Sequence, residues 1–426
     1  MLYFILFIFS GLAYNDTKFL PVVFILFSIF FVRKFFELKK DGVDYATIML
    51  IFMAYALPFS WRNVFGGDYG SFPLSWFHVF GLLYVFYILS LKSKVIPRRL
   101  MLIFSLSTVA TVVSILPLIY SNSAFFEQAL SQFVVMTFNN VIILFSIFKY
   151  NQLSTEKMGI IRDAYIKGAV FTSVMLICQF LLYKYANFEF GYITFLYNRI
   201  LTCYLFTDIS HGTLYLGTAA FWLLYTTKNK KSSTKEYFLI LIISLGSAIT
   251  SARTGLFILG GFIFVYILFG QKNVLKRIGL LFVFLIIAYL SFEFLQSVRQ
   301  IDNVNELTNS SGRTHGYKMA LIALKGSPWI GYGYSRNYIA TMLGDTVPHL
   351  SILQYALHGG IFFALTLYYN QFLIFLDAVN KKSVFSWLLA MVLIGTCLIP
   401  DLFATRYITL LVVLSLAYKN ESLDYS

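Results

Sequence analysis

The chain has 426 residues, of which 59% are hydrophobic and only 12% are charged. This composition excludes an ordinary soluble globular protein. Its apolar runs are continuous rather than alternating, which favours membrane-spanning helices over a β-barrel. The formal net charge of +14 would suit nucleic-acid binding, but the positions of the basic residues argue against that class of function.

The apolar runs predict an all-α fold, a polytopic bundle of 12 to 14 membrane-spanning helices that forms a single integral membrane domain over residues 1–426. The first run begins at Leu2 with no basic leader and no small-residue cleavage site, so we expect it to be a retained span. The expected spans are 2–14, 19–32, 45–60, 73–91, 100–119, 129–148, 168–184, 206–226, 237–250, 255–270, 278–295, 350–376, 384–400 and 404–418.

Twenty-two of the 33 Lys and Arg residues fall in alternate loops on one side of this arrangement. The positive-inside rule assigns that side, with both chain termini, to the cytoplasm. The net charge therefore reflects topology and contact with anionic membrane lipids, and nucleic acid is not an expected partner.

The opposite, outward face carries basic residues that the positive-inside rule disfavours. A cation near membrane depth costs a few kcal/mol unless it is paired or hydrated, so these residues predict an outward-facing site for an anion such as a pyrophosphate. They are Arg199, Arg253 and Arg313, together with His211, His315 and His349. The acidic residues of this face are separated in the sequence, and we expect no divalent metal site and no cofactor.

A long outer loop, residues 296–349, interrupts the span pattern and is expected to contain short helices. Ser310 or Ser311 should cap a helix that runs through residue 324 or so, and Gly326 and Pro328 should stop it. Arg313 falls in its first turn, where the helix dipole disfavours a cation, and shares a face with Tyr317. This placement suggests an anionic partner. The alternative is an arginine that reaches lipid headgroups or pairs with a nearby acid.

The run PWIGYGY follows in the same loop. Its glycines interrupt helix and let backbone approach closely. The rings of Trp329 and Tyr334 suit stacking against a sugar, but equally suit the membrane interface. His349 then opens the next span, where a histidine is either structural or a general base.

TSARTG, residues 250–255, divides two apolar segments and puts Arg253 at the outer membrane boundary. This arginine is either half of a long-range ion pair or part of an anion site, because its guanidinium fork matches phosphate oxygens. Further back, Asp208 and His211 are three residues apart, so on a helix that starts near Phe206 the carboxylate would orient the histidine or pair with an arginine.

Three blocks of this sequence resemble the superfamily of bacterial O-antigen polymerases and O-antigen ligases, over roughly residues 195–375. TSARTG is similar to its Ser-Arg-Gly/Thr block. GRTHGYKMALIALKGSPWIGYGY is similar to a block with an arginine, an aromatic residue, a helix and Pro-x-x-Gly-x-Gly. HLSILQYALHGGIFF is similar to a block that begins with histidine. The matching residues are Arg253, Arg313, Tyr317, Pro328, Gly331, Gly333, His349, Leu353 and Gly359, with a weaker match at Arg199.

The resemblance implies a metal-independent glycosyltransferase of the inner membrane. A sugar hydroxyl attacks the anomeric carbon of a glycan carried on undecaprenyl pyrophosphate, and the lipid pyrophosphate leaves at the periplasmic face. Arg253 and Arg313 would stabilise the charge that develops on the pyrophosphate, and His349 would be the base. Candidate substrate-binding residues are Arg199, Tyr317, His211, His315, Asp208, Trp329 and Tyr334. A polysaccharide chain-length regulator is a candidate partner.

This sequence departs from the family pattern at two positions. Tyr317 stands where tryptophan is common, and Leu350 stands where asparagine often follows the histidine. The second departure favours a polymerase over a ligase that transfers glycan to lipid A–core. A flippase or other transporter of lipid-linked sugar is a third reading, but it would place cations along the middle of several spans and show structural repeats.

Overall fold

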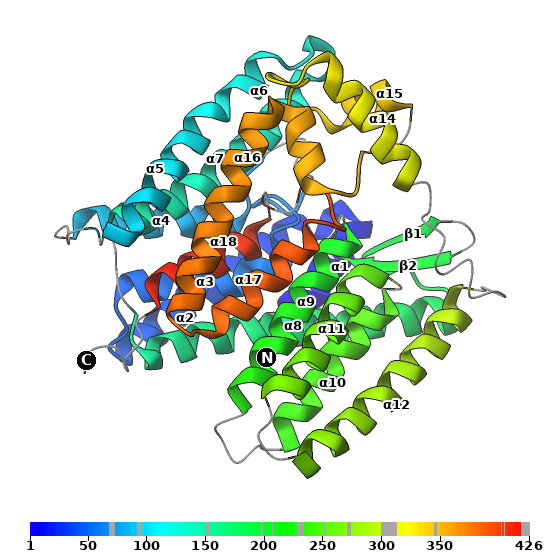
Figure 1. Cartoon of the computed structure of the whole chain (residues 1–426). Helices are drawn as coiled ribbons and strands as arrows, with labels where there is room; N and C mark the ends of the chain where they lie inside the picture. Colours follow the sequence, from blue (N-terminus) through cyan, green and yellow to red (C-terminus); the bar gives the residue numbers. More distant parts are fainter. Residues whose placement is uncertain are drawn as a thin grey trace. The chain divides into compact units, whose positions relative to one another are not determined.

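The structure is a computed structural model of the whole chain, and it is almost entirely helical (Figure 1). The residues that it describes are 1–67, 73–91, 96, 98–149, 153–196, 199–206, 208–227, 234–250, 252–270, 274–299, 313–344, 347–401, 403 and 405–418.

The chain divides into two compact units, and each unit is built from two separate stretches of sequence. Unit 1 comprises Met1–Phe19 and Ala169–Ser310. Unit 2 comprises Leu20–Gly168 and Ser311–Ser426.

Unit 1 contains helices and one small hairpin. The hairpin pairs strands β1 and β2 antiparallel. The elements are α1 (Leu2–Asn15), η1 (Thr17–Phe19), the second part of α8 (Thr155–Ala186), β1 (Tyr192–Leu196), β2 (Arg199–Tyr204), α9 (Ile209–Thr227), α10 (Thr234–Ile249), α11 (Arg253–Gly270) and α12 (Val274–Arg299).

Unit 2 contains the remaining helices and the first part of α8. Its elements are α2 (Leu20–Lys40), α3 (Tyr45–Ala56), η2 (Leu57–Phe59), α4 (Trp76–Ser90), α5 (Arg98–Val113), α6 (Ile115–Ile119), η3 (Ser123–Phe125), α7 (Phe126–Phe148), α14 (Arg313–Gly326), α15 (Arg336–Leu343), α16 (Ser351–Asn380), α17 (Val384–Gly395) and α18 (Arg406–Ala417).

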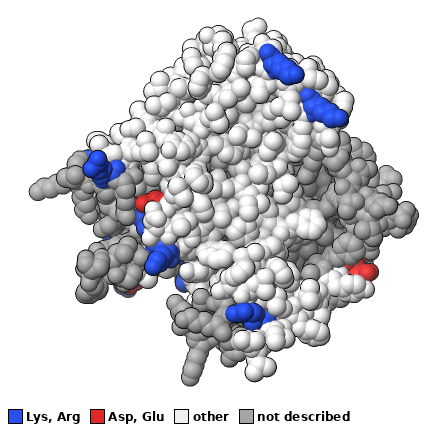
Figure 2. Space-filling model, in the orientation of Figure 1, with Lys and Arg blue, Asp and Glu red and all other residues white. Residues whose placement is uncertain are grey.

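The expectation of a helical, polytopic membrane protein is confirmed, because every expected span falls on a helix. Among the described residues, five helical stretches are long and apolar enough to cross a bilayer, and further apolar helical stretches have only 10–17 residues. The five stretches are Thr17–Lys40, Leu100–Ile119, Ser123–Phe148, Thr155–Ala186 and Ser351–Asn380. On the face in Figure 2, most of the described surface belongs to residues without a charged side chain, with scattered Lys and Arg and a few acidic side chains.

The hairpin is an element that the sequence analysis did not include, because it lies between the spans expected at 168–184 and 206–226. It is anchored by Gln179 of α8, whose buried amide donates to the Phe190 carbonyl at 2.5 Å and to the Tyr192 carbonyl at 3.0 Å. The same side chain accepts from the Tyr204 N–H at 3.0 Å. One amide thus satisfies three backbone groups that would otherwise be costly to bury.

A buried ion pair closes the other end of α16. Lys381 Nζ lies 2.7 Å from Asp377 Oδ2, and the two side chains are only 2% and 6% exposed. Lys381 Nζ also donates to the Ser415 and Leu416 carbonyls at 2.8 and 3.1 Å. The ammonium therefore caps the last turn of α18, where carbonyls have no intrahelical partner and a cation is favoured.

Candidate functional site

Helix α16 is broken eight residues after it begins. Gly359 has φ −132° and ψ 16°, and Gly360 has φ 83° and ψ 172°, neither of which is helical. The break removes the normal intrahelical partners of nearby backbone groups, which must find other partners if they are buried.

The loop of residues 327–335, which contains the Pro-x-x-Gly-x-Gly pattern, supplies those partners. The Tyr332 N–H donates to the Leu357 carbonyl at 2.6 Å, and the Gly333 N–H donates to the His358 carbonyl at 2.9 Å. In return, the Ile361 N–H donates to the Pro328 carbonyl at 2.8 Å. We call this arrangement the latch: residues 327–335 hydrogen-bonded across the break of α16.

The glycines of the latch are required by its geometry. Gly331 and Gly333 have φ values of +72° and +89°. A Cβ on Gly331 would lie 2.6 Å from the His358 carbonyl oxygen, and a Cβ on Gly360 would lie 2.0 Å from the Trp329 carbonyl oxygen. The close backbone approach that the sequence predicted therefore serves the contact between this loop and α16.

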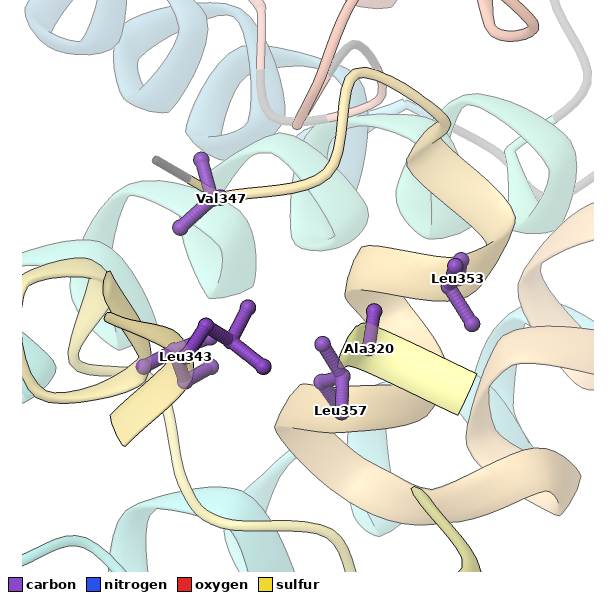
Figure 3. Close-up of a cluster of buried hydrophobic side chains, with 6 residues drawn as sticks. Ala320, Leu343, Val347, Leu353 and Leu357 are labelled. Atoms are coloured by element: carbon purple, nitrogen blue, oxygen red, sulfur yellow. The ribbon is translucent and has the colours of Figure 1, made fainter. Parts of the chain in front are cut away.

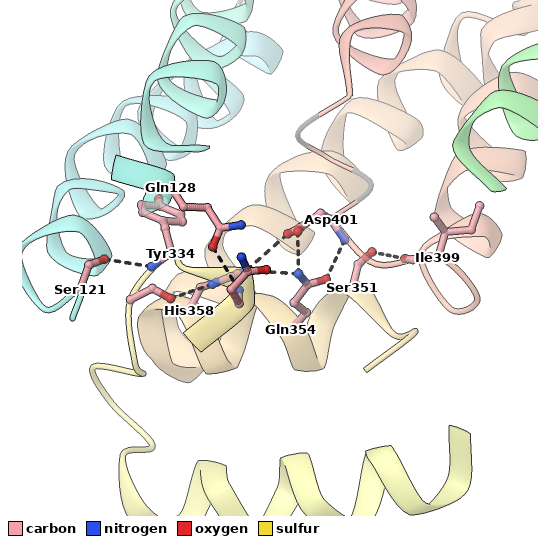
Figure 4. A network of polar contacts seen from close by, with 10 residues as sticks. Ser121, Gln128, Tyr334, Ser351, Gln354, His358, Ile399 and Asp401 are labelled. Carbon is pink, nitrogen blue, oxygen red and sulfur yellow. Dashed lines mark hydrogen bonds and ion pairs between the residues drawn. The ribbon is translucent and has the colours of Figure 1, made fainter. Parts of the chain in front are cut away.

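A buried polar network connects the latch to the turn between α17 and α18 (Figure 4). The His358 Nδ1–H donates to the Gly333 carbonyl at 2.8 Å. His358 Nε2 lies 3.5 Å from Asp401 Oδ1 and 3.2 Å from Gln354 Nε2. The Gln354 amide donates to Asp401 Oδ2 at 2.6 Å, and its oxygen accepts from the Asp401 N–H at 2.9 Å.

This environment favours the ionised form of Asp401. Burial by itself raises the pKa of the carboxyl. The hydrogen bond and charge of His358, the charge of Arg336 and the hydrogen bond from Gln354 together outweigh burial, so the pKa of Asp401 is lowered from its ordinary value. Asp401 is therefore a carboxylate held between a histidine and an amide.

The other side of the latch contacts α7 and Ser121, the second residue after α6. Ser121 Oγ accepts from the Tyr334 N–H at 3.1 Å. Gln128 Oε1 accepts from the Ser335 hydroxyl at 2.8 Å and from the Asn337 N–H at 3.1 Å. Ser335 in turn accepts from the Tyr338 N–H and caps α15. The latch is therefore held on two sides within unit 2.

His349 lies two residues before α16 and is partly buried. Its carbonyl accepts from the Tyr317 hydroxyl at 3.2 Å, so the residue four places after Arg313 contacts the histidine that opens α16. Tyr317 packs against a buried cluster from α14, α15 and α16, with Val347 before α16 (Figure 3): Ala320, Ile339, Leu343, Val347, Leu353 and Leu357. The packing holds the motif blocks of Arg313 and His349 together.

In unit 1, helices α9 and α11 begin side by side. A Cβ on Gly255, in the first turn of α11, would lie 2.3 Å from Oγ1 of Thr213, the fifth residue of α9. Further along, the rings of Phe221 and Phe262 are 6.1 Å apart, and those of Tyr225 and Tyr266 are also 6.1 Å apart. The two helices are therefore parallel, and their N-termini, where a negative charge is favoured, meet at one end.

The expected relation between Asp208 and His211 is present at this end of α9. Asp208 Oδ1 accepts from the Ser210 N–H at 2.8 Å, as a helix N-cap does. Its other oxygen lies 3.9 Å from His211 Nε2. The carboxylate therefore faces both the helix N-terminus and the imidazole, and His211 itself is buried.

The three candidate arginines all lie at the first residue of an element. Arg253 begins α11, Arg313 begins α14 and Arg199 begins β2; their side chains lie outside the described part of the structure. The hydroxyl of Thr202 in β2 donates to the Ile249 carbonyl at 3.2 Å, so the strand of Arg199 contacts the end of the helix before Arg253.

The remaining candidates divide by exposure. His315 is exposed on α14, and Trp329 is 62% exposed and stacks on Phe362 with 5.2 Å between ring centroids. Tyr334 is fully buried between Ser121 and His358. Its ring packs inside the protein, so we assign it to the support of the latch rather than to a sugar-facing surface.

The protein is thus a helical polytopic membrane protein in which the loop of residues 327–335 is hydrogen-bonded onto a broken helix. Residues 238–369 match the family model Wzy_C, described as O-antigen ligase. This match, which covers all three motif blocks, supports the O-antigen polymerase and ligase superfamily. The family indicates a glycosyltransferase-like activity in the O-antigen pathway, of polymerase or ligase type. No curated protein matches the chain.

Sequence reasoning missed His358, Gln354 and Asp401 as a group. Gln354 and His358 are four residues apart on one helical face, which is a usable signal. Asp401, however, is 43 positions after His358, and nothing in the spacing indicates their contact.

Proposed function

We propose that this protein is an O-antigen polymerase of the bacterial inner membrane. It transfers a glycan from undecaprenyl pyrophosphate to a sugar hydroxyl of another lipid-linked repeat unit at the periplasmic face, with both chain termini in the cytoplasm. The main support is the contact between Tyr317 and His349, which joins the block of Arg313 to the histidine at the start of α16.

The chemistry requires one base and one site for a departing anion. The acceptor hydroxyl oxygen forms a bond to the anomeric carbon, and the bond from that carbon to the pyrophosphate oxygen breaks. The hydroxyl proton passes to His349, and a positioned base of this kind contributes about 10²–10⁴-fold to rate. The pyrophosphate leaves with the electron pair of the broken bond.

The arginines suit the departing pyrophosphate. Arg253 and Arg313 each begin a helix, where free backbone N–H groups and the dipole favour an anion and disfavour an unaccompanied cation. An anion at these positions would be bound by the guanidinium fork and by the helix N-terminus together. Preorganised positive charge stabilises the transition state without a metal cofactor.

We assign roles to the substrate-binding candidates from their positions in the fold. Arg199 supports the pyrophosphate beside Arg253, and Asp208 and His211 line the same end of unit 1. In unit 2, His315 and Trp329 are exposed and accessible to a glycan or to membrane lipid. A polysaccharide chain-length regulator remains the proposed protein partner.

Analysis of lipopolysaccharide from a strain that lacks the gene tests the polymerase. A single repeat unit on the core is the expected result, because the ligation step persists without polymerisation. Unchanged long chains would refute both a polymerase and a ligase.

The ligase is the second candidate because the matched family is described as an O-antigen ligase. If the protein is a ligase, lipopolysaccharide from the strain that lacks the gene should consist of bare core, and lipid-linked polymer should accumulate in the membrane. Leu350, where asparagine often follows the histidine in the family, is our reason for preferring the polymerase.

A further inference from the structure

We propose that the pair formed by His358 and Asp401 is a positioning device for the transfer reaction. The pair holds the latch and the first turns of α16 in one arrangement and so fixes His349 at the reaction centre. This inference rests on the proposed function.

His358 acts through other residues rather than on substrate. Its side chain is fully buried, so no glycan or pyrophosphate reaches it in this arrangement. Its two ring nitrogens contact two different segments: Nδ1 donates to Gly333 in the latch, and Nε2 faces Asp401 in the turn between α17 and α18. The imidazole is thus the one side chain of Figure 4 that bridges these two segments directly.

Over its first two helical turns, one face of α16 is hydrogen-bonded to the segment between α17 and α18. The Ser351 N–H donates to the Thr396 carbonyl at 2.8 Å, and the Ser351 hydroxyl donates to the Ile399 carbonyl at 2.5 Å. Gln354 exchanges two hydrogen bonds with Asp401. Since residues 351, 354 and 358 share one helical face, the turn fixes the rotation of α16 about its axis.

His349 lies two residues before this hydrogen-bonded segment of α16, and its carbonyl accepts a hydrogen bond from the Tyr317 hydroxyl. A rotation or shift of the first turns of α16 therefore moves His349 relative to the block of Arg313. A displacement of about 1 Å at a catalytic group costs about 10²-fold in rate, even when the cause is remote.

Two conservative variants separate the two contacts of the imidazole. Asparagine places an amide nitrogen near Nδ1, so His358→Asn keeps the bond to Gly333 and loses the contact with Asp401. Glutamine reaches toward Nε2, so His358→Gln keeps Asp401 and loses Gly333. Asp401→Asn removes the charge and keeps the shape. His78, the other fully buried histidine of unit 2 among the described residues, provides a matched control as His78→Asn.

The test uses the full-length enzyme in lipid nanodiscs with a lipid-linked oligosaccharide as substrate. We expect His358→Ala to lower kcat by about 10²-fold, with KM changed by less than about 3-fold, because geometry rather than binding is lost. His358→Asn and His358→Gln should each fall by about 10-fold, since each retains one contact. Hydrogen exchange should rise at the Tyr332 and Gly333 amides in His358→Gln and His358→Ala, and His78→Asn should leave kcat and these amides unchanged.

The possible results are distinguishable. Wild-type kcat in His358→Ala, or an equal loss in His78→Asn, overturns the inference, as does unaltered exchange at the Tyr332 and Gly333 amides. A wild-type enzyme that transfers no glycan refutes the proposed function instead, and the exchange measurement still decides whether His358 holds the latch.

Discussion

Replacement of Gly360 by alanine isolates the contribution of the latch. The backbone of Gly360 lies in a region that is accessible essentially only to glycine, and forcing a side chain there costs about 1–3 kcal/mol. The new Cβ would also lie 2.0 Å from the Trp329 carbonyl oxygen. The latch must therefore move, which puts its three backbone hydrogen bonds across the break at risk, each worth about 0.5–1.5 kcal/mol net.

The combined loss is about 4 kcal/mol of the free energy of unfolding, taking about 1 kcal/mol for each of the three bonds and the lower part of the strain range. At an unfolding entropy of about 2 cal/mol/K per residue, this loss lowers Tm by about 5 °C for a chain of this length. Thermal unfolding of the purified protein in detergent, followed by tryptophan fluorescence, measures the shift.

Two other glycines serve as controls. Gly344 has φ +65° but no atom within 4 Å of its Cβ position, so Gly344→Ala carries strain without a displaced neighbour. Gly159 lies within α8 with nothing near its Cβ position, and Gly159→Ala should stabilise the helix by about 0.5–1 kcal/mol. A Gly360→Ala protein with the Tm of Gly344→Ala would refute the assignment of the latch as a stabilising contact.

Three further predictions concern activity, stability and pH. Each of three alanine variants should abolish polymer on a lipopolysaccharide gel while the protein stays at normal levels in the membrane: Arg253→Ala, Arg313→Ala and His349→Ala. Arg313→Lys should restore little polymer, because lysine lacks the guanidinium fork. Full polymer from His349→Ala would exclude His349 as the base. Lys381→Ala leaves the Asp377 carboxylate buried without its ammonium partner and should lower the free energy of unfolding by about 3–5 kcal/mol. The double variant Lys381→Ala/Asp377→Ala should lose less, and equal losses in the two variants would contradict a coupled pair. The pKa of Asp401 is lowered in the folded protein, so its stabilising contribution is present above the ordinary value of about 4 and is lost as pH falls through the lowered pKa. When Tm is measured from pH 7 down to pH 3, it should therefore drop less steeply in Asp401→Asn than in the wild type. Parallel Tm curves would show that the Asp401 carboxyl carries no such linkage.

The helices were predictable from the sequence because their signal is local. A run of apolar side chains must satisfy its backbone internally in a membrane, so every expected span appears as a helix. Helix α14 also begins and ends close to its predicted bounds, since Gly326 and Pro328 stop it whatever surrounds them.

The arrangement within the candidate site was not predictable, because non-local contacts determine it. The two glycines after His358 look like ordinary small residues within a span, and only the approach of residues 327–335 explains why they break α16. Similarly, the pairing of Gln179 with a hairpin leaves no periodic trace in the sequence. Tyr334 is a different case. An aromatic residue in a polar loop suggests stacking against a sugar, and only the structure shows that this ring is buried.

The break in α16 has a consequence for biogenesis. A bilayer contains no water to hydrogen-bond the Leu357 and His358 carbonyls, so a newly inserted α16 can satisfy them only by remaining continuous through Gly359 and Gly360. Docking of residues 327–335 then exchanges the intrahelical bonds of these groups for bonds to the loop, without leaving a bare polar group. We therefore expect α16 to insert as a continuous helix and to break at Gly359 and Gly360 only when residues 327–335 dock on it.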